Sequence, residues 1–225
     1  MEYGKFVLDF FEKYPELKKK VKGWKACLTG PFTLAGEILI TEKLTEGKRL
    51  LVYQEPRAIM SGKLVNKLAE MMANIAEKYN EMGADIISMD EPTLGLIVGR
   101  RRAFFHKDDA IIDILDKAID PIDKYSSIHV CGNVSPKLRD ILLNSKVSIM
   151  DHEFANGSNE GIFEKQLLED KKKILAYGVL ISNVKKKENA ELGDYVENIK
   201  EIETRIEKAV ETVGRENLIF KPDCG

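Results

Sequence analysis

The sequence lacks the features that mark secreted, membrane-spanning and nucleic-acid-binding proteins. No stretch of roughly 18 apolar residues occurs, so we expect no membrane-spanning helix. The opening stretch "MEYGKFVLDFFEKYPELKKK" mixes charged residues into its apolar run, which argues against a signal peptide. The formal net charge is −2, whereas a dedicated nucleic-acid-binding protein usually carries a clear basic excess. We therefore expect a globular protein with neither nucleic-acid nor membrane partners.

Cysteine is scarce, with three residues in a chain of 225. An odd number of cysteines without a secretion signal argues against a disulfide framework and predicts a cytoplasmic protein with reduced thiols. Such thiols are available for metal binding or chemistry. The G-x-G-x-x-G fingerprint of dinucleotide-binding sheets is also absent.

Short apolar runs alternate with helical patterns along the chain, which predicts an α/β protein with a parallel sheet. The predicted strands are residues 24–30, 85–90, 126–131, 147–153, 174–182 and 218–223. The predicted helices lie near residues 34–45, 57–82, 108–119, 136–144, 160–171 and 193–213. Gly83 marks the end of the second of these helices, and Ser135 followed by Pro136 is suited to begin the fourth.

Polar residues gather just after most of the predicted strands, among them Asp90-Glu91, His129-Cys131 and Asp223-Cys224. Functional groups drawn from the same end of every strand are typical of a TIM-type (β/α) barrel, and we predict that residues 1–225 form one such catalytic domain. Barrels of this type have eight strands in roughly 250 residues, whereas six strand–helix units are visible. The predicted barrel is therefore incomplete. The chain is a fragment of a longer barrel, or it pairs with a complementing chain or a second copy, or it contains strands that the pattern does not reveal.

His129 and Cys131 stand two positions apart at the end of a predicted strand, so both side chains point to the same face. Cys224 follows another strand in "IFKPDCG", and Asp151 and Glu153 alternate to one face in "VSIMDHEF". A histidine, two cysteines and one carboxylate would form a four-ligand site of the kind that zinc prefers. The three strand ends taken together favour a metal centre.

Simpler interpretations apply to single residues of this group. A lone buried cysteine is usually a small apolar core residue, and this is our prediction for Cys27 in the middle of its strand. His152 alternates with its two acidic neighbours, so we expect it behind the strand as a hydrogen-bonded histidine and not as a ligand.

Five motifs, in their order along the chain, resemble the catalytic barrel of cobalamin-independent methionine synthase: "LTGPFT", "SMDEPTLG", "IHVCGNV", "DHEF" and "IFKPDCG". The resemblance covers nearly the whole chain and points to the short archaeal core forms. The same superfamily includes uroporphyrinogen decarboxylase and the methylcobalamin:coenzyme M methyltransferases. The resemblance implies zinc held by His129, Cys131, Glu153 and Cys224, and it implies that Asp90 binds the amino group of homocysteine. Whether Asp151 replaces Glu153 as a ligand stays open.

The implied reaction is methyl transfer to the thiol of homocysteine, which forms methionine. A zinc site with two thiolates and a carboxylate promotes loss of the substrate thiol proton and leaves the sulfur nucleophilic. Glu91 is either a second substrate anchor or a charge at a helix start. Folate-dependent members have a histidine where this chain has Asn183. Because Co(I) leaves without a proton, Asn183 favours a methylcorrinoid as the methyl donor, with a corrinoid protein as a partner.

Other interpretations of the same residues remain. In the family the first two strands also contribute a Gly-Ser segment and an acid that hold the amino acid, and no counterpart is found upstream of residue 24. The acceptor could instead be another thiol such as coenzyme M, or the chain could be a non-catalytic zinc-binding partial barrel. Uroporphyrinogen decarboxylation needs no metal and would leave the cysteines unexplained.

Overall fold

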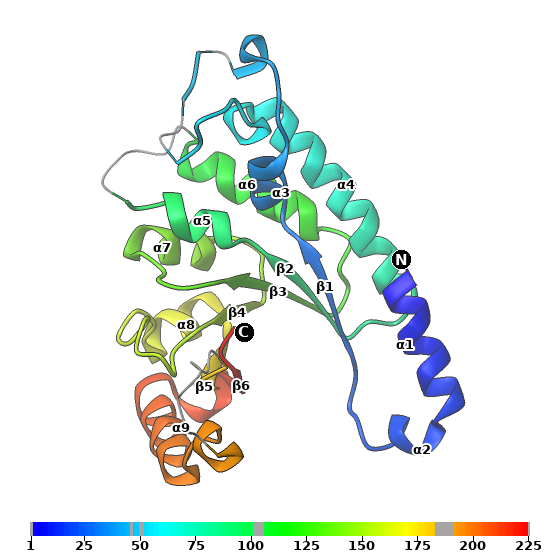
Figure 1. Cartoon of the computed structure of the whole chain (residues 1–225), viewed down its shortest axis with the longest axis vertical. Helices are drawn as coiled ribbons and strands as arrows, with labels where there is room; N and C mark the ends of the chain where they lie inside the picture. Colours follow the sequence, from blue (N-terminus) through cyan, green and yellow to red (C-terminus); the bar gives the residue numbers. More distant parts are fainter. Residues whose placement is uncertain (1, 46, 50–51, 101–105, 183–190, 225) are drawn as a thin grey trace.

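Six strands form in the regions where the sequence predicts them. The computed structural model describes residues 2–45, 47–49, 52–100, 106–182 and 191–224. The strands are β1 (Lys25–Thr29), β2 (Ile86–Asp90), β3 (Tyr125–Val130), β4 (Ile149–His152), β5 (Ile174–Leu180) and β6 (Leu218–Pro222). Helices occupy the connections between them (Figure 1). The α/β prediction is confirmed.

The strands make one parallel sheet in chain order, from β1 to β6. Successive βα units that always pack beside the previous one give this order, because the crossover connections share one hand. Within the described part of the chain, β1 and β6 each pair with a single neighbour, so the sheet is open at both edges. This agrees with the prediction of an incomplete barrel.

The helices have the following bounds. They are α1 (Glu2–Lys13), α2 (Pro15–Lys18), α3 (Pro31–Glu37), α4 (Gly62–Glu81), α5 (Pro92–Ile97), α6 (Asp108–Ile119), α7 (Pro136–Asn144), α8 (Lys165–Lys171) and α9 (Ile199–Val213). The 3-10 turns are η1 (Glu42–Thr45), η2 (Ala58–Met60), η3 (Leu192–Tyr195) and η4 (Arg215–Asn217). Among the described helices, none combines the length and apolar character needed to cross a membrane.

Local signals explain where several helices begin and end. Helices α6 and α7 have the predicted bounds, and the Ser135 hydroxyl oxygen accepts a hydrogen bond from the backbone N–H of Leu138 at 3.1 Å. The predicted helix 34–45 ends early, because the chain becomes extended at the β-branched Ile38. The predicted helix 160–171 starts only at residue 165, because the chain first turns with Gly161 at a positive φ of 71°.

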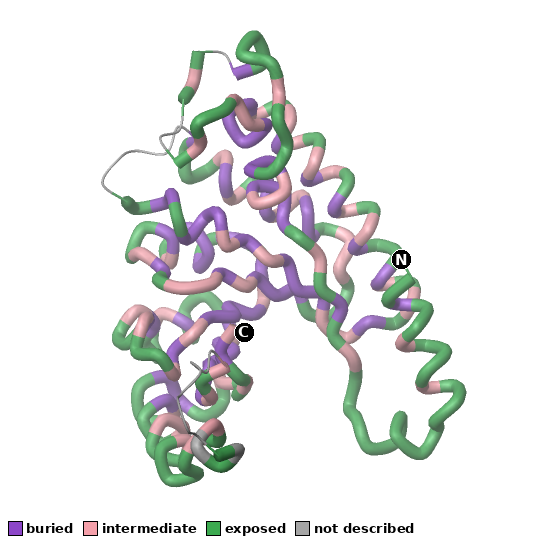
Figure 2. The backbone as a smooth tube through the Cα atoms, in the orientation of Figure 1, coloured by how far each residue is buried: buried purple, intermediate pink, exposed green. Residues whose placement is uncertain are grey.

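The helices cover the outer face of the sheet and bury its apolar side chains. Alternate strand residues point to this face, and those that are at most 2% exposed include Ala26, Ile87, Met89, Ile128, Val130, Met150 and Leu175. Figure 2 shows the buried backbone concentrated where the sheet meets α3 to α7, whereas α1, α2 and α9 are largely exposed. Burying each large apolar side chain contributes roughly 1.5–3 kcal/mol, so this layer holds the fold.

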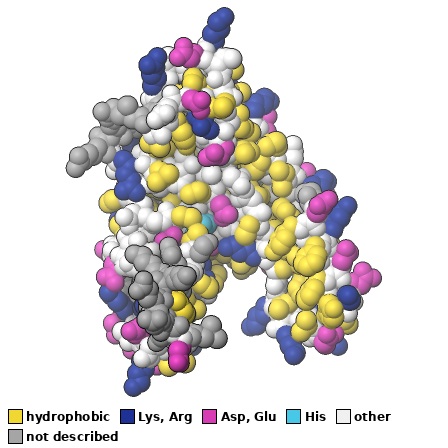
Figure 3. All heavy atoms as spheres, in the orientation of Figure 1, with side chains coloured by type: hydrophobic (Ala, Val, Ile, Leu, Met, Phe, Trp, Pro, Cys, Tyr) yellow, Lys and Arg dark blue, Asp and Glu magenta, His cyan; other side chains and the backbone are white. Residues whose placement is uncertain are grey.

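The inner face of the sheet carries the other half of the strand residues and is more polar. The prediction that Cys27 is a core residue is wrong, because its side chain is exposed on this inner face. Cys27 lies on the edge strand β1, which within the described residues pairs only with β2. The space-filling view shows the molecule hollowed between the lobe of α1 and α2 and the lobe that contains α9 (Figure 3).

Candidate metal centre

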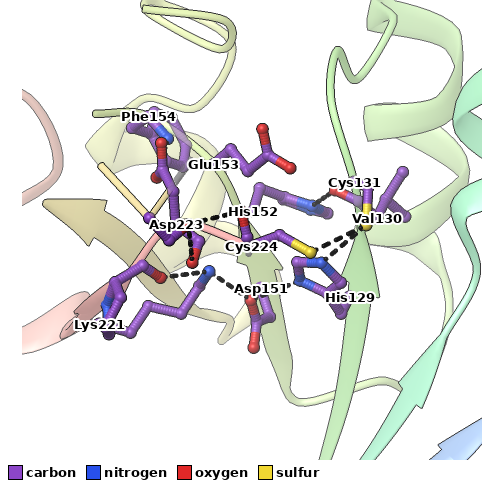
Figure 4. A network of polar contacts seen from close by, with 12 residues as sticks. His129, Val130, Cys131, Asp151, His152, Glu153, Phe154, Lys221, Asp223 and Cys224 are labelled. Atoms are coloured by element: carbon purple, nitrogen blue, oxygen red, sulfur yellow. Dashed lines mark hydrogen bonds and ion pairs between the residues drawn. The ribbon is translucent and has the colours of Figure 1, made fainter. Parts of the chain in front are cut away.

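Three predicted ligands meet at the carboxyl ends of the strands. The His129 Nε2 atom lies 3.2 Å from the Cys131 Sγ atom, which in turn lies 3.3 Å from the Cys224 Sγ atom. One ligand atom from each residue falls within 4.8 Å of the other two (Figure 4). His129 is the fifth residue of β3, Cys131 follows the strand directly, and Cys224 follows β6. His129 and Cys131 are two residues apart at the end of β3, and their side chains therefore point into the same site, as predicted.

The dimensions of this cluster fit zinc. With Zn–S bonds of about 2.3 Å and Zn–N bonds of about 2.0 Å, tetrahedral coordination separates two sulfurs by about 3.8 Å and sulfur from nitrogen by about 3.5 Å. The observed separations of 3.3 and 3.2 Å need only a small widening. Burial raises the pKa of the Cys131 thiol to about 12, and the adjoining Cys224 and the carboxylates of Glu153 and Asp90 add to the rise. A cation at this point would reverse that rise, since it favours the thiolate.

Glu153 lies next to the cluster without belonging to it. Its Oε1 atom accepts a hydrogen bond from the backbone N–H of Gly132 at 3.1 Å, and its Oε2 atom accepts one from the Asn156 amide at 2.7 Å. The bond to Gly132 keeps the carboxylate beside the turn that follows Cys131. The assignment of Glu153 as the fourth ligand therefore stays a prediction.

Asp151 lies deeper in the site and contacts histidine. Its Oδ1 atom is 2.8 Å from His129 Nδ1 and 3.0 Å from Lys221 Nζ, and its Oδ2 atom is 2.9 Å from Lys25 Nζ. Burial by itself would raise the pKa of Asp151, but the hydrogen bond with His129 and the two lysine charges hold it well below its usual range. These contacts favour the ionised form of the Asp151 carboxylate.

Asp90 ends β2 and pairs in register with His129 on β3. Its side chain is half-buried, and within the described residues neither a hydrogen bond nor an ion pair engages its carboxylate. Burial raises the pKa of Asp90, and the charges of His129 and Lys25 partly oppose this rise. A carboxylate of this kind, beside a histidine of the candidate metal cluster, is suited to receive a cationic group.

Glu91 does not join this group. It is fully buried, and its carboxylate accepts hydrogen bonds from the backbone N–H groups of Phe32 and Thr33 at 2.9 and 2.8 Å, and from the Thr33 hydroxyl at 2.7 Å. Burial raises its pKa to about 7. Of the two sequence interpretations, the structure favours a charge at a helix start, although the helix is α3 and not α5, which directly follows Glu91. A substrate could reach Glu91 only by breaking these bonds.

The structure also identifies Asp223 as a residue that organises the site. Its carboxylate accepts hydrogen bonds from three successive backbone N–H groups, those of Phe154, Ala155 and Asn156, at 2.9, 3.2 and 3.1 Å. It thus ties the loop after β4 to the turn that carries Cys224. The sequence placed Asp223 at a strand end, but its bonding partners lie almost 70 residues away, and no local signal reveals them.

Asn159 has a similar role and was missed by sequence reasoning. It is completely buried, and its amide donates to the backbone carbonyls of Gly132 and Glu153 at 2.9 and 2.7 Å. Its Oδ1 atom accepts from the backbone N–H of Val134 at 2.8 Å. Asn159 therefore joins the loops that leave β3 and β4, which carry Cys131 and Glu153.

His152 points away from the cluster, as predicted. It is fully buried on the outer face, where its ring stacks on Phe163 at a centroid distance of 5.3 Å. Its Nδ1 atom lies 3.4 Å from the Val130 carbonyl oxygen, but its buried Nε2 atom has no hydrogen-bond partner among the described residues. Only one of the two ring nitrogens of His152 therefore has the expected hydrogen-bond partner.

Asn183, on which the prediction of the methyl donor depends, lies outside the described residues.

The fold and the site define a parallel α/β protein in which one histidine and two cysteines that could hold a metal ion meet at the carboxyl edge of the sheet. The chain belongs to the uroporphyrinogen decarboxylase (URO-D) family, whose sequence profile matches residues 14–161, more than half of the chain. This match includes His129, Cys131 and Glu153 and ends before Cys224.

Curated relatives carry a more specific name. The chain is 29% identical over 205 residues to the methionine synthase of Methanothermobacter thermautotrophicus, with 91% of this chain and 56% of that protein covered. It is 25% identical over 221 residues to the methionine synthase of Thermoplasma acidophilum, with 91% and 58% covered. The chain thus spans a little over half the length of these relatives.

Solved structures agree on the fold. A B12-independent methionine synthase from Shewanella sp. W3-18-1, in complex with selenomethionine, superposes with a TM-score of 0.60 at 20% identity, covering 96% of this chain and 59% of that one. A methyltransferase from Methanosarcina mazei superposes with a TM-score of 0.59 at 18% identity, covering 89% and 52%. At these identities the likeness shows the shared architecture alone.

Proposed function

We propose that the chain is a zinc-dependent S-methyltransferase that methylates the thiol of homocysteine to form methionine. The observation that carries the proposal is the convergence of His129, Cys131 and Cys224. The names of the curated relatives support the same substrate. A cytoplasmic location, where thiols stay reduced, belongs to the proposal as well.

The proposed ligands are His129, Cys131, Cys224 and Glu153. Two thiolates and one carboxylate around a divalent cation give a site charge of about −1. When bound, zinc would favour the thiolate form of the acceptor at neutral pH while leaving its sulfur nucleophilic. The acceptor thiol loses its proton to solvent, its sulfur forms a bond to the methyl carbon, and the electron pair of the old methyl bond leaves with the donor.

The substrate's amino group is assigned to Asp90. An ammonium group at this carboxylate would fill the position that has no bonding partner in the described structure, and the ion pair would orient the neighbouring thiol toward the metal ligands. Glu91 would not contact the substrate, but would hold the first turn of α3 in place beside Asp90.

The proposed methyl donor is a methylcorrinoid, delivered by a corrinoid protein. Asn183 cannot supply the proton that a folate leaving group needs, whereas Co(I) leaves without one. The main alternative function is methyl transfer to another acceptor thiol, such as that of coenzyme M. The uncommitted carboxylate of Asp90 favours an acceptor with an amino group. A complementing chain or a second copy that covers the unpaired edges of β1 and β6 is also part of the proposal.

The proposal is tested first by metal content. Purified wild-type protein and the variants Cys224→Ser and Cys27→Ser are compared by elemental analysis, and Cys27→Ser is the matched control because this thiol lies outside the cluster. We expect about one zinc per chain in the wild type and the control and a large loss in Cys224→Ser. Homocysteine and methylcobalamin are then supplied, and methionine is measured. A wild-type protein that takes up no zinc would refute the proposal, and zinc uptake without methionine would favour another acceptor thiol or the non-catalytic partial barrel.

A further inference from the structure

We propose that Asp151 is a positioning residue that fixes the ring of His129 and ties it to both edge strands of the sheet. This inference deepens the proposed function and rests on it for the role of the metal. Asp151 on β4 faces His129 on β3 across one pair of the parallel ladder. The 2.8 Å contact between Oδ1 and Nδ1 joins two side chains that are only 4% and 11% exposed.

The contact determines which ring nitrogen is available to a metal. The Asp151 carboxylate accepts a hydrogen bond from Nδ1, and this contact favours the tautomer of His129 that carries its proton on Nδ1. The lone pair then resides on Nε2, the atom that lies 3.2 Å from Cys131 Sγ. A carboxylate behind a metal-ligating histidine fixes both the tautomer and the ring orientation in this way.

Asp151 is itself held in place from two directions. Lys25 on β1 contacts Oδ2 at 2.9 Å, and Lys221 on β6 contacts Oδ1 at 3.0 Å. Both carboxylate oxygens are thus engaged by donors that lie away from the thiols, and Figure 4 shows Lys221 and His129 on opposite sides of Asp151. Asp151 therefore stays behind the histidine, which leaves Glu153 as the carboxylate for the fourth ligand position.

Asp151 thus contacts a lysine from each of the two edge strands of the sheet. Lys25 and Lys221 belong to the first and last strands of the order, and neither strand pairs with the other. Their amino groups reach the same buried carboxylate because the open sheet curves. The orientation of His129 is consequently coupled to the separation of the two unpaired edges.

The tautomer of His129 is the direct test, and it needs no metal. Two-bond 15N–1H spectra of the metal-free protein near about pH 8 distinguish a ring protonated on Nδ1 from one protonated on Nε2. We expect Nδ1 protonation in the wild type and loss of this single tautomer in Asp151→Ala. The exposed Asp140→Asn is the control, with no change expected. Protonation on Nε2 in the wild type would overturn the proposal, even if Asp151→Ala does not fold.

Zinc competition with a chromophoric chelator gives the second readout. We expect the affinity to fall roughly 10- to 100-fold in Asp151→Ala, and to recover in part in Asp151→Asn, whose amide oxygen can still accept from Nδ1. An unchanged affinity in Asp151→Ala would contradict the inference. If the wild type binds no zinc, the proposed function fails, but the tautomer still decides the role of Asp151.

Discussion

The Sγ atoms of Cys131 and Cys224 lie 3.3 Å apart although the two residues follow strands that are not neighbours in the sheet. Two further strands, β4 and β5, separate β3 from β6. The thiols can meet only because the sheet curves toward a barrel, so that side chains at the carboxyl ends converge. The cluster of His129, Cys131 and Cys224 thus results from the curvature of the sheet and does not require the sheet to be closed.

Zinc should stabilise the fold, because its ligands come from β3 and β6. A ligand that binds only the folded state at about 1,000 times its Kd contributes about 4 kcal/mol. We predict that added zinc raises the Tm of the metal-free wild type by several degrees and that a chelator reverses the rise. In scanning fluorimetry Cys27→Ser should follow the wild type, whereas a similar rise in Cys224→Ser would show binding elsewhere.

Replacement of Asp90 should separate substrate binding from metal binding. In Asp90→Asn the amide cannot pair with an ammonium charge, so we expect the KM for homocysteine to rise by about tenfold or more, with zinc content unchanged. Steady-state kinetics beside elemental analysis measure both. A fall in zinc content without a change in KM would place Asp90 in the metal site and remove it from substrate recognition.

Asp223 should contribute to stability and to the metal site together. In Asp223→Asn the amide oxygen can still accept from the backbone N–H groups of Phe154 and Ala155, but the amide nitrogen then faces the N–H of Asn156. We expect a loss of about 1–3 kcal/mol in the free energy of unfolding. Weaker zinc binding should accompany it, since the turn with Cys224 loses its anchor. Urea unfolding measures the first effect and chelator competition the second. The exposed Asp170→Asn on α8 is the control, and equal behaviour of both variants would refute this role.

Glu91 should make the protein less stable as the pH rises from about 4.5 to about 7. Its pKa in the folded state is about 7, above the ordinary value of 4.5, so between these values the unfolded chain releases the proton first. Ionisation then favours the unfolded state, by roughly 3 kcal/mol at pH values above 7. Asp90 lies close by and adds to the rise, and the Tyr53 hydroxyl lies within electrostatic reach.

The measurement for Glu91 is urea unfolding of the wild type and Glu91→Gln at pH 5 and at pH 7.5. The difference between the two proteins isolates the carboxylate from every other titrating group. We expect Glu91→Gln to be less stable at pH 5, because its amide keeps only one acceptor oxygen for the donors of Phe32 and Thr33. We also expect it to lose less stability than the wild type on going to pH 7.5. Parallel pH profiles would mean that the carboxylate keeps an ordinary pKa.

The sequence was sufficient for the parts of the fold that depend on periodicity and for the site residues at strand ends. The strands, the bounds of α6 and α7, and the meeting of His129, Cys131 and Cys224 followed from alternation and from the parallel topology. Such patterns say which face a side chain occupies, but they do not identify its neighbour on a distant strand. The contact of Lys25 with Asp151, over 126 positions, was therefore not predictable.

The same limit explains why the sequence left the role of Glu91 open and why the prediction for Cys27 was wrong. Glu91 lies beside Asp90 in the sequence, yet its partners are the first residues of α3, 58 and 59 positions away. Cys27 has a strand position that would be buried in a closed barrel, and it is exposed because β1 is an edge strand. In both cases the outcome depends on which elements pack against the residue, and that is a property of the whole fold.

The alternation of residues along β3 has a consequence for how this protein can change over time. Ile128 and Val130 maintain the apolar layer under the helices, while His129, between them, serves the opposite face. Substitutions at the inward positions can alter ligand chemistry with little loss of packing, since the outward positions keep the strand in place. Single substitutions at inward positions can thus change the activity of the protein, while the outward residues that determine its stability stay the same.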